Sequence, residues 1–209
     1  MPSAREPVQS RAHKTRAALL AAAERDFEER GYAQTTTKTI ADRAGVAAGS
    51  FYQYFKDKDA VLRELASARM ASLRGRLTSI GLPAIDAGQS VEQIESAARR
   101  ALKVMLDEVV AYHRLEPGLH AVLSERRSAD SALDAMTSES EHAFVASIEL
   151  VLVHFGFSGD RKATAFVIFG LIEGSVHSHV LGTRVVSDKR VSEALGNGII
   201  AIIKSGLSR

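Results

Sequence analysis

Hydrophobic residues recur three and four residues apart along almost the whole chain, with polar residues between them. This spacing places the apolar side chains on one face of an α-helix. The pattern predicts an all-α protein of about nine helices, with no convincing strand and no internal repeat. The predicted helices span residues 10–30, 37–44, 48–55, 58–79, 90–113, 118–127, 130–155, 160–181 and 187–205.

Residue types that favour helix ends separate these segments. Gly45 follows an apolar helical stretch, and glycine adopts the left-handed backbone of a helix C-terminus without steric cost. Ser90 with Gln93 three residues later is the pattern of a capping box. Asp160 and Ser187 can cap the N-termini of the last two helices. Residues 1–10 hold two prolines and no periodicity, so we interpret them as a mobile arm.

The stretch 36–58 carries two short helical segments with a tight turn between them. In the first segment, Ile40, Ala41 and Ala44 share one face. In the second, Phe51 and Phe55 lie four residues apart and are expected to face inward. A plain helical hairpin within a core would show the same arrangement, so the outward face has to distinguish the two interpretations.

The outward face of the second segment is small and uncharged. It is made of Ala48, Gly49, Ser50, Tyr52, Gln53 and Tyr54. A solvated helix normally carries charges on this side, whereas a face without them suits close contact with another surface. Lys56 and Lys58 follow directly. Together these features are typical of a DNA-binding helix-turn-helix.

A longer set of residues with fixed spacings surrounds this motif. Its members are Leu19, Ala22, Ala23, Phe27, Gly31, Tyr32, Thr36, Thr37, Ile40, Ala41, Ala44, Gly45, Val46, Gly49, Tyr52, Tyr54, Phe55, Lys58 and Leu62. In these residues the chain resembles the tetracycline-repressor (TetR) family of bacterial transcription regulators. The resemblance covers the first third of the chain. Ala47 stands where the family usually has a capping Ser or Thr, which weakens that helix start by about 1 kcal/mol, and Phe51 replaces a more common Leu.

Both the residues and the resemblance indicate candidates for DNA contact. Ala48 and Gly49 allow close approach to the major groove, while Ser50 and Gln53 can hydrogen-bond base edges. Thr37 can cap the first motif helix and also bond a phosphate.

The family resemblance adds four more candidate residues for DNA contact. Positions matching Tyr52 and Tyr54 contact backbone phosphate or thymine methyls in the family, Lys58 matches a phosphate-binding lysine, and Lys38 matches a position that often reaches DNA. For each of these residues, a solvated side chain or a packed tyrosine is the alternative.

The distribution of charge agrees with a phosphate-binding N-terminal end. Residues 1–58 hold ten Lys or Arg and seven Asp or Glu (10 − 7 = +3), and the remainder holds 17 and 18 (17 − 18 = −1). The excess is modest, so it is weak evidence by itself.

The chain has no cysteine, which excludes disulfides, thiolate zinc sites and thiol catalysis. The first residues lack the apolar core of a secretory signal, so a cytoplasmic protein is expected. The most hydrophobic stretch, residues 163–182, would have to bury Glu173, His177 and His179 in a membrane. It is interpreted instead as a helix at the centre of its domain or at an interface.

The resemblance implies that helices between residues 90 and 181 enclose an effector pocket. The candidate lining residues are Met105, Val109, His113, His120, Phe144, Ile148, Phe166, Phe169, Glu173 and His177. Most are apolar or aromatic, which favours a hydrophobic or amphipathic ligand. For each apolar residue, plain core packing is the alternative. Glu173 on an apolar helix needs a partner, which can be a ligand cation, an arginine or a histidine.

The resemblance also implies a homodimer through the last two helices. Gly170 and Gly174 permit close approach of a partner helix, and these helices have too few polar residues for a fully exposed face. The alternative is that both helices only complete the core of the monomer.

No cofactor, metal site or enzymatic activity is expected. His177 and His179 point to different sides of a helix and cannot chelate one metal together. His113, His120 and His154 lie on different elements, and no Ser-His-Asp order, phosphate loop or paired-carboxylate motif stands out.

The sequence therefore predicts an arm and DNA-binding domain over residues 1–58 and a ligand-binding and dimerisation domain over residues 59–209. The predicted function is that of a transcriptional repressor. It would bind a pseudo-palindromic operator in double-stranded DNA and be released by a small hydrophobic or amphipathic molecule. A helical small-molecule- or lipid-binding protein whose helix-turn-helix no longer binds DNA is the alternative.

Overall fold

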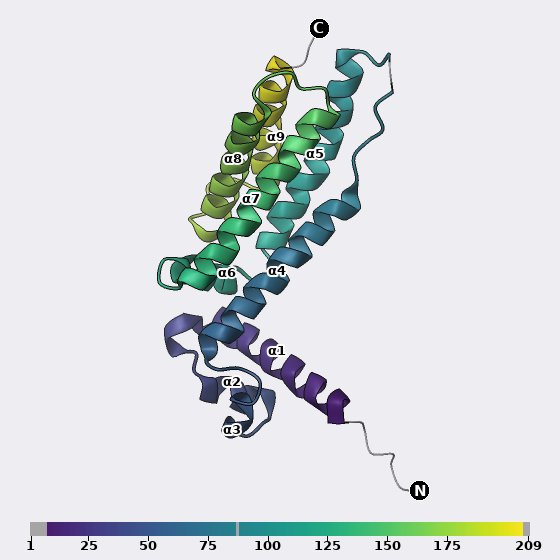
Figure 1. Ribbon diagram of the computed structural model, residues 1–209. Coiled ribbons are helices and arrows are strands. Elements are labelled where there is room, and N and C mark those ends of the chain that lie inside the picture. Colours follow the sequence, from purple (N-terminus) through teal and green to yellow (C-terminus); the bar gives the residue numbers. More distant parts are fainter. Residues whose placement is uncertain (1–7, 87, 207–209) are drawn as a thin grey trace, which may run out of the picture. The chain divides into compact units, whose positions relative to one another are not determined.

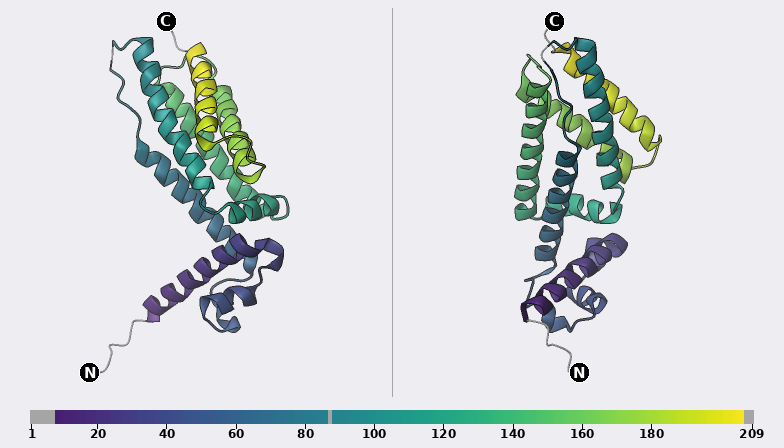
Figure 2. Two further views of the ribbon diagram at one scale, coloured as in Figure 1. Left: turned by 180° about the vertical axis from the view of Figure 1, so that it is seen from behind. Right: turned by 90° about the vertical axis from the view of Figure 1, so that its right-hand side faces the viewer.

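A computed structural model describes residues 8–86 and 88–206 of the chain, and these residues form helices joined by turns and loops (Figures 1 and 2). The predicted all-α class is confirmed. The helices are α1 (Val8–Gln34), α2 (Thr37–Ala44), α3 (Ala48–Phe51), α4 (Lys58–Ile80), α5 (Val91–His113), α6 (Pro117–Arg127), α7 (Ser131–His154), α8 (Arg161–Leu181) and α9 (Asp188–Ser205). The predicted N-terminal arm lies largely outside the described residues.

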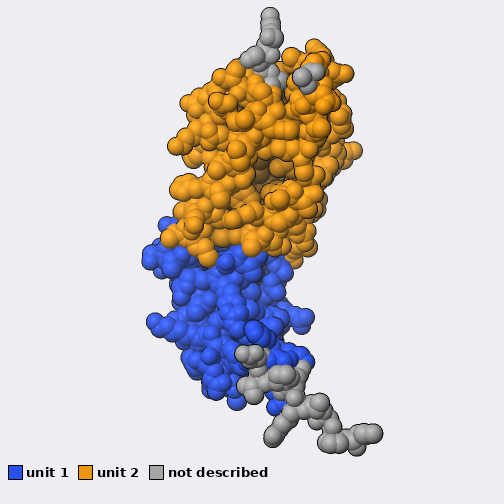
Figure 3. All heavy atoms as spheres, turned by 45° about the vertical axis from the view of Figure 1, so that its right-hand side comes forward, with its two compact units in different colours: residues 1–69, 116–134 blue, residues 70–115, 135–209 orange. Residues whose placement is uncertain are grey.

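The helices divide into two compact units, which Figure 3 distinguishes by colour. Unit 1 comprises residues 1–69 and 116–134, and unit 2 comprises residues 70–115 and 135–209. Helix α4 is continuous but contributes its first half to unit 1 and its second half to unit 2. These bounds differ from the predicted functional domains 1–58 and 59–209, and that division of function stays a prediction.

Unit 1 is built around α1, which packs against α2 and α6. Its core holds fully buried side chains from each of these helices, including Phe27, Ile40 and Leu119. The start of α6 lies very close to α1, because a Cβ atom at Gly118 would stand 2.4 Å from the backbone oxygen of Glu28. Only glycine permits this approach, so Gly118 is required for the packing of α6 on α1.

Polar groups also stabilise unit 1. The carboxylate of Asp26 is fully buried, and its Oδ1 lies 2.6 Å from Nε of Arg43 on α2. The carboxylate of Glu28 accepts a hydrogen bond of 2.6 Å from the backbone N–H of Leu119, an orphan donor in the first turn of α6. Buried or partly buried carboxylates of α1 therefore tie both neighbouring helices to it.

Unit 2 is an apolar bundle in which α5 packs on α9 and α8 packs on both. Its main core cluster contains Leu106 of α5, Leu152 of α7, Ile168 of α8, and Ile199 and Ile203 of α9. These residues recur at helical spacing on the inward faces, as the sequence predicts.

Most predicted helix ends are confirmed within a residue or two. The capping box of Ser90 and Gln93 is present, and Asp160 accepts a hydrogen bond of 3.0 Å from the N–H of Ala163. Ser187 occupies the N-cap position of α9 but makes no capping hydrogen bond. The chain leaves helical geometry at Gly31, where a helix end was predicted, although a further turn continues to Gln34.

Helix α8 is long and apolar enough to cross a membrane by length and composition alone, and it is the one described helix that meets this test. Only 22% of the residues in its most apolar 18-residue stretch are buried within the chain. Of the two predicted places for this helix, the centre of a domain or an interface, the exposed side fits the interface.

Candidate DNA-binding surface and ligand cavity

The first motif helix has both of its ends capped. Thr36 is extended and accepts a hydrogen bond of 3.1 Å from the N–H of Thr39, whose hydroxyl accepts from the N–H of Thr36 in return. Gly45 ends the helix in the left-handed region at φ 69°. The prediction that Thr37 caps this helix is therefore wrong, because Thr37 is its first helical residue and Thr36 has the extended backbone of an N-cap.

The second motif helix is shorter than predicted. It ends at Phe51 rather than residue 55, since the backbone N–H of Tyr54 bonds the carbonyl of Phe51 in a tight turn. Ala47 occupies its N-cap and makes no side-chain hydrogen bond, which agrees with the missing capping residue noted in the sequence. Buried Phe51 and Phe55 anchor the segment, with 5.8 Å between their ring centroids.

The predicted DNA-contacting residues lie on and around this anchored segment. Exposed members are Lys38, Ala48, Gly49, Tyr52 and Gln53, and partly buried members are Thr37, Ser50, Tyr54 and Lys58. The hydroxyl groups of Thr37 and Tyr52 lie 2.9 Å apart, so α2 and α3 share a polar contact on the outside. The ammonium group of Lys38 pairs with Asp42 at 2.7 Å, which raises the pKa of Lys38.

Lys58 has a structural role that the sequence did not indicate. Its Nζ donates hydrogen bonds to the backbone oxygens of Tyr32 at 2.7 Å and Thr35 at 2.8 Å, and it lies 3.8 Å from the centre of the Tyr32 ring. Burial lowers the pKa of Lys58. Burial and a hydrogen bond to Asp59 raise the pKa of Tyr32 to about 12. An ammonium group has three N–H donors, so one remains for a phosphate beside the two backbone bonds.

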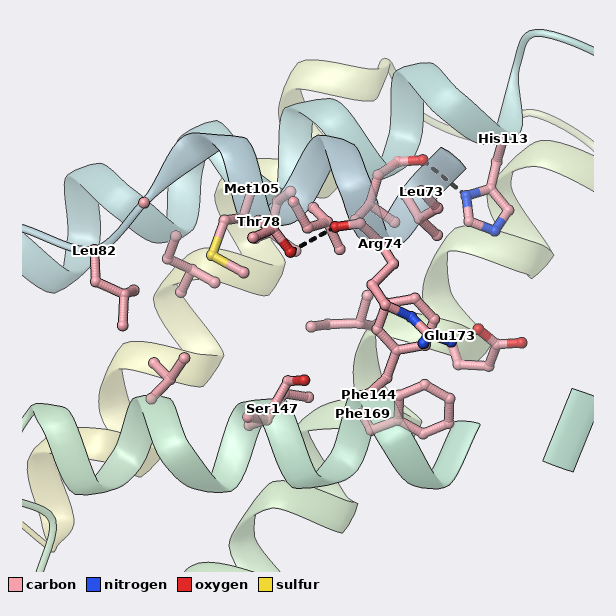
Figure 4. Close-up of a pocket in the computed structure, with 18 residues that line it drawn as sticks. Leu73, Arg74, Thr78, Leu82, Met105, His113, Phe144, Ser147, Phe169 and Glu173 are labelled. Atoms are coloured by element: carbon pink, nitrogen blue, oxygen red, sulfur yellow. Dashed lines mark hydrogen bonds between the residues drawn. The ribbon is translucent and has the colours of Figure 1, made fainter. Parts of the chain in front are cut away.

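Unit 2 contains a cavity of about 280 Å³ between α4, α5, α7 and α8 (Figure 4). Its wall is mainly aliphatic and aromatic, with a few polar groups. The lining residues are Leu73, Arg74, Leu77, Thr78, Gly81, Leu82, Leu102, Met105, Leu106, Val109, His113, Phe144, Ser147, Ile148, Val151, Phe169, Ile172 and Glu173.

Seven predicted lining residues face this cavity. They are Met105, Val109, His113, Phe144, Ile148, Phe169 and Glu173. His120 belongs to α6 in unit 1, Phe166 is 67% exposed, and His177 does not line the cavity. The sequence reasoning also missed Arg74, Thr78 and Ser147. A charged or hydroxyl side chain on a helix is usually exposed to solvent, so the sequence does not show that it lines a cavity until the neighbouring helices are placed.

The polar side of the cavity carries Glu173 and His113, and His177 lies beside them outside the cavity wall. Nδ1 of His177 lies 3.1 Å from Oε1 of Glu173, so a histidine is one partner of this carboxylate, as the sequence allowed. Nδ1 of His113 lies 2.7 Å from the backbone oxygen of Val109, and the His113 and His177 rings meet edge to face at 5.3 Å. Burial lowers the pKa of His177.

His179 lies on a different side of α8, as its spacing from His177 predicts. Its Nε2 stands 2.7 Å from Oδ1 of Asp188, and the guanidinium of Arg114 lies 2.8 Å from the same oxygen. These bonds, that of Arg114 first, lower the pKa of Asp188 to about 2. The cluster joins the end of α5, the end of α8 and the first turn of α9.

The outer side of α8 exposes several large apolar residues. They are Phe166, Val167, Leu171 and Leu181. A Cβ atom at Gly170 or Gly174 would meet no other atom within 4 Å, so this side of the helix is open along the glycines as well.

Comparison with known proteins identifies the N-terminal region. Residues 19–65 match the profile of the tetR family of bacterial regulatory proteins. The N-terminal region of the chain is therefore of the TetR type. The match covers the two motif helices and the α1 and α4 segments that pack around them, which are the segments that carry the resemblance in the sequence.

Curated relatives are transcriptional regulators. The chain is 30% identical over 100 residues to the transcriptional repressor KstR2 of Rhodococcus jostii, covering 48% of each protein. It is 45% identical over 62 residues to the regulator TtgR of Pseudomonas putida, covering 30% of this chain and 28% of TtgR. The chain thus matches less than half the length of these two relatives. The chain is also 27% identical to a fatty acid metabolism regulator protein of Bacillus subtilis, and the match covers 90% of this chain and 93% of that protein.

Solved structures share the fold of this chain. A transcriptional regulator from Rhodococcus sp. RHA1 gives a TM-score of 0.73 at 18% identity, covering 93% of this chain and 98% of that one. The fatty acid degradation regulator FadR from Bacillus halodurans gives a TM-score of 0.65 at 18% identity, and the match covers 95% of this chain and 97% of FadR. At this identity the likeness establishes the fold alone.

Proposed function

We propose that this chain is a TetR-type transcriptional repressor that binds a pseudo-palindromic operator as a homodimer and is released by a small hydrophobic or amphipathic molecule. The observation that carries the proposal is the exposed, uncharged face of the second motif helix within the family's DNA-binding region. The cavity in unit 2 supports the ligand-responsive part of the proposal.

In this proposal α3 enters the major groove. The small side chains of Ala48 and Gly49 permit close approach, and exposed Gln53 reads a base edge. Tyr52 and Lys58 contact the phosphate backbone, and Thr37 supports Tyr52 through their hydroxyl contact. Phosphate contacts position the motif, whereas the Gln53 contact contributes sequence preference.

Helix α4 is the element through which a ligand would act on the DNA-binding end. Leu73, Arg74, Leu77 and Thr78 of α4 line the cavity in unit 2. The first turn of the same helix carries Lys58, which bonds the backbone beside the motif in unit 1. A ligand that favours a different position of α4 would lower DNA affinity by the coupling free energy, typically about 1–3 kcal/mol.

The names of two relatives suggest a class of ligand. Both the Bacillus subtilis and the Bacillus halodurans relatives are named as regulators of fatty acid metabolism or degradation. An aliphatic and aromatic cavity of about 280 Å³ fits part of an acyl chain, and Arg74 offers a cation for an acidic head group. A long-chain acyl compound is therefore the first effector to test.

A second copy of the chain is the proposed partner for the exposed side of α8. A dimer presents two recognition helices about 34–36 Å apart, which matches successive turns of the major groove. The large apolar residues and the glycines on this side supply a surface that a symmetric partner can cover.

A gel-shift titration on the gene's own upstream region, at fixed salt and with non-specific competitor, tests the DNA-binding proposal. Gln53→Ala is expected to relax the preference at one base pair, at a cost of about 1–3 kcal/mol. Gln34→Ala removes the same exposed side chain from the end of α1 and serves as the matched control. Absence of any specific shift would favour the alternative of a ligand-binding protein that has lost DNA binding.

Sedimentation of two glycine variants tests the dimer. Gly174→Glu adds a charge to the proposed interface, and the open space beside the glycine lets the monomer accept the side chain. Gly75→Glu places the same residue at an exposed glycine of α4 with equal space around it. The first variant is expected to sediment as a monomer and the second as a dimer, and a dimeric Gly174→Glu would rule out this interface.

A further inference from the structure

Two histidines that are far apart in the sequence meet beside the cavity of unit 2. His113 is the last residue of α5 and is 6% exposed, and His177 lies in the second half of α8. A ring nitrogen of each lies within 4.8 Å of the other. Two imidazole nitrogens on one tetrahedral zinc ion at 2.0–2.1 Å are roughly 3.4 Å apart, so a shift of little more than about 1 Å brings the pair into ligand geometry.

A hydrogen bond at Nδ1 selects the tautomer of the His113 ring. The Val109 carbonyl oxygen can only accept, so Nδ1 of His113 carries the proton and donates it. Neutral His113 therefore has its lone pair on Nε2, which is the form that binds a metal ion. Nδ1 of His177 lies 3.1 Å from Oε1 of Glu173, which places a carboxylate beside that ring nitrogen.

These acceptors are also the kind that accompany metal-bound histidines. In metalloproteins, a ligating histidine usually donates its second ring nitrogen to a backbone carbonyl or a carboxylate, which orients the ring and raises its basicity. Val109 supplies the carbonyl for His113, and Glu173 supplies the carboxylate for His177.

We propose that His113 and His177 bind a divalent transition-metal ion such as Zn²⁺ or Co²⁺ through their Nε2 atoms. Glu173 is a positioning residue for His177 in this site. Imidazole ligands favour zinc, cobalt, nickel and copper over magnesium and calcium. His113 and Glu173 also line the cavity, so the coordination positions that the histidines leave open can take water or a polar group of a bound small molecule.

This site goes beyond the proposed repressor function, because neither DNA binding nor release by an apolar molecule requires a metal. It also revises the expectation from the sequence. The spacing of His177 and His179 excludes a shared metal, and the structure agrees, but the partner of His177 comes from another helix. Only the packing of α5 against α8 brings the two rings together.

The first experiment uses the unmodified full-length protein. After treatment with a chelator and its removal, the protein is titrated with Co²⁺ while the visible d–d absorption is recorded. One equivalent per chain is expected to bind. In a parallel titration with Zn²⁺, the Nε2 resonances of two histidines, seen in ¹⁵N–¹H long-range spectra, are expected to shift as ligands. Binding that leaves the His113 and His177 resonances unchanged would overturn the proposal.

Variants then assign the ligands. His113→Gln and His177→Gln are each expected to weaken Co²⁺ binding at least tenfold, and Glu173→Gln to weaken it by about 10–100-fold. His142→Gln changes an exposed histidine of α7 and should bind as the unmodified protein does. Circular dichroism checks that each variant is folded. Unchanged Co²⁺ affinity in folded His177→Gln, or no binding by the unmodified protein at tens of micromolar Co²⁺, would also contradict the site.

Discussion

The two compact units are stabilised by different kinds of interaction. In unit 1, a fully buried carboxylate joins α1 to α2, and a partly buried lysine and a tyrosine hydroxyl join α4 to the end of α1. In unit 2, aliphatic clusters hold the bundle and leave a cavity among them. Directional polar bonds define one geometry, whereas apolar contacts tolerate rearrangement at lower cost.

This difference suits the two proposed tasks. A DNA-reading surface has to keep its side chains in fixed register with the bases, so it benefits from hydrogen bonds that admit one arrangement. A cavity that accepts a ligand benefits from walls that can adjust, and the side chains of Met105 and the leucines around it can change rotamer. Unit 1 is therefore expected to be sensitive to polar substitutions and unit 2 to changes in volume.

The largest expected effect is at Asp26. Asp26→Ala removes the fully buried partner of Arg43, whose guanidinium then keeps only its bonds to the exposed Glu29, and breaking a buried pair in this way costs up to about 3–5 kcal/mol. Hydrogen–deuterium exchange of α1 and α2 amides measures the loss within unit 1. Lys103→Ala, which removes one exposed ion pair with Asp107, is the control and should change stability by less than about 1 kcal/mol. A small effect of Asp26→Ala would remove the contrast between the units.

The matching change in unit 2 is Leu106→Ala. Leu106 is 1% exposed in the main core cluster and also borders the cavity. Truncating a buried leucine costs roughly 2–5 kcal/mol, because apolar contact is lost and the void is only partly filled. Urea unfolding followed by exchange of α5 amides checks this value. Leu150→Ala truncates a leucine of α7 that is 69% exposed and should have little effect.

An intermediate effect is expected at Lys58. Lys58→Met keeps the length of the side chain but removes the donors to the Tyr32 and Thr35 carbonyls, and hydrogen bonds to charged groups contribute about 1.5–3 kcal/mol. Thermal unfolding measures the loss. If Lys58 also binds phosphate, the salt dependence of DNA affinity falls by about one unit of slope. Loss of stability with an unchanged slope would leave Lys58 with its structural role alone.

The smallest effect concerns the polar cluster in unit 2. The pKa of Asp188 is about 2, below its ordinary value of 3.8, so the charged carboxylate stabilises the fold above pH 3.8 and this contribution is lost as the pH falls through 2. Because Asp188 is 38% exposed, solvent screening reduces its contribution to about 1 kcal/mol. Asp188→Asn should unfold more easily than the unmodified protein at pH 6, and the difference should disappear near pH 2. A difference that persists there would exclude the carboxylate charge as its cause.

Helix positions were predictable because each depends on neighbours in the sequence. The apolar spacing along α5 and α9 and the capping pairs at Ser90 and Asp160 act within one or two turns, so the sequence contains the whole cause. The end of α3 at Phe51 was missed, because the tight turn that follows depends on how two phenylalanines pack. The role of Lys58 was missed for a similar reason, since its partners are carbonyls at the end of α1 and just after it, more than twenty residues earlier in the chain.

The candidate ligand site was predictable only in part. Apolar residues at helical spacing on α5, α7 and α8 line the cavity where their faces point to a common interior, as Phe144 and Phe169 do, and their contact with a ligand stays a prediction. Phe166 shares the composition but is exposed on α8. Which face of an apolar helix turns inward depends on the helices beside it, and composition alone does not distinguish an inner face from one that awaits a partner.

The sequence by itself determined the class of fold, the places of the helices and the family of the DNA-binding motif. Those properties follow from local periodicity, capping and a motif with fixed spacings. The tertiary structure alone decided that Asp26 pairs with Arg43, that Lys58 bonds backbone carbonyls, and that His113 meets His177. These pairs join residues on different helices, and nothing in their local sequence specifies which helix packs against which.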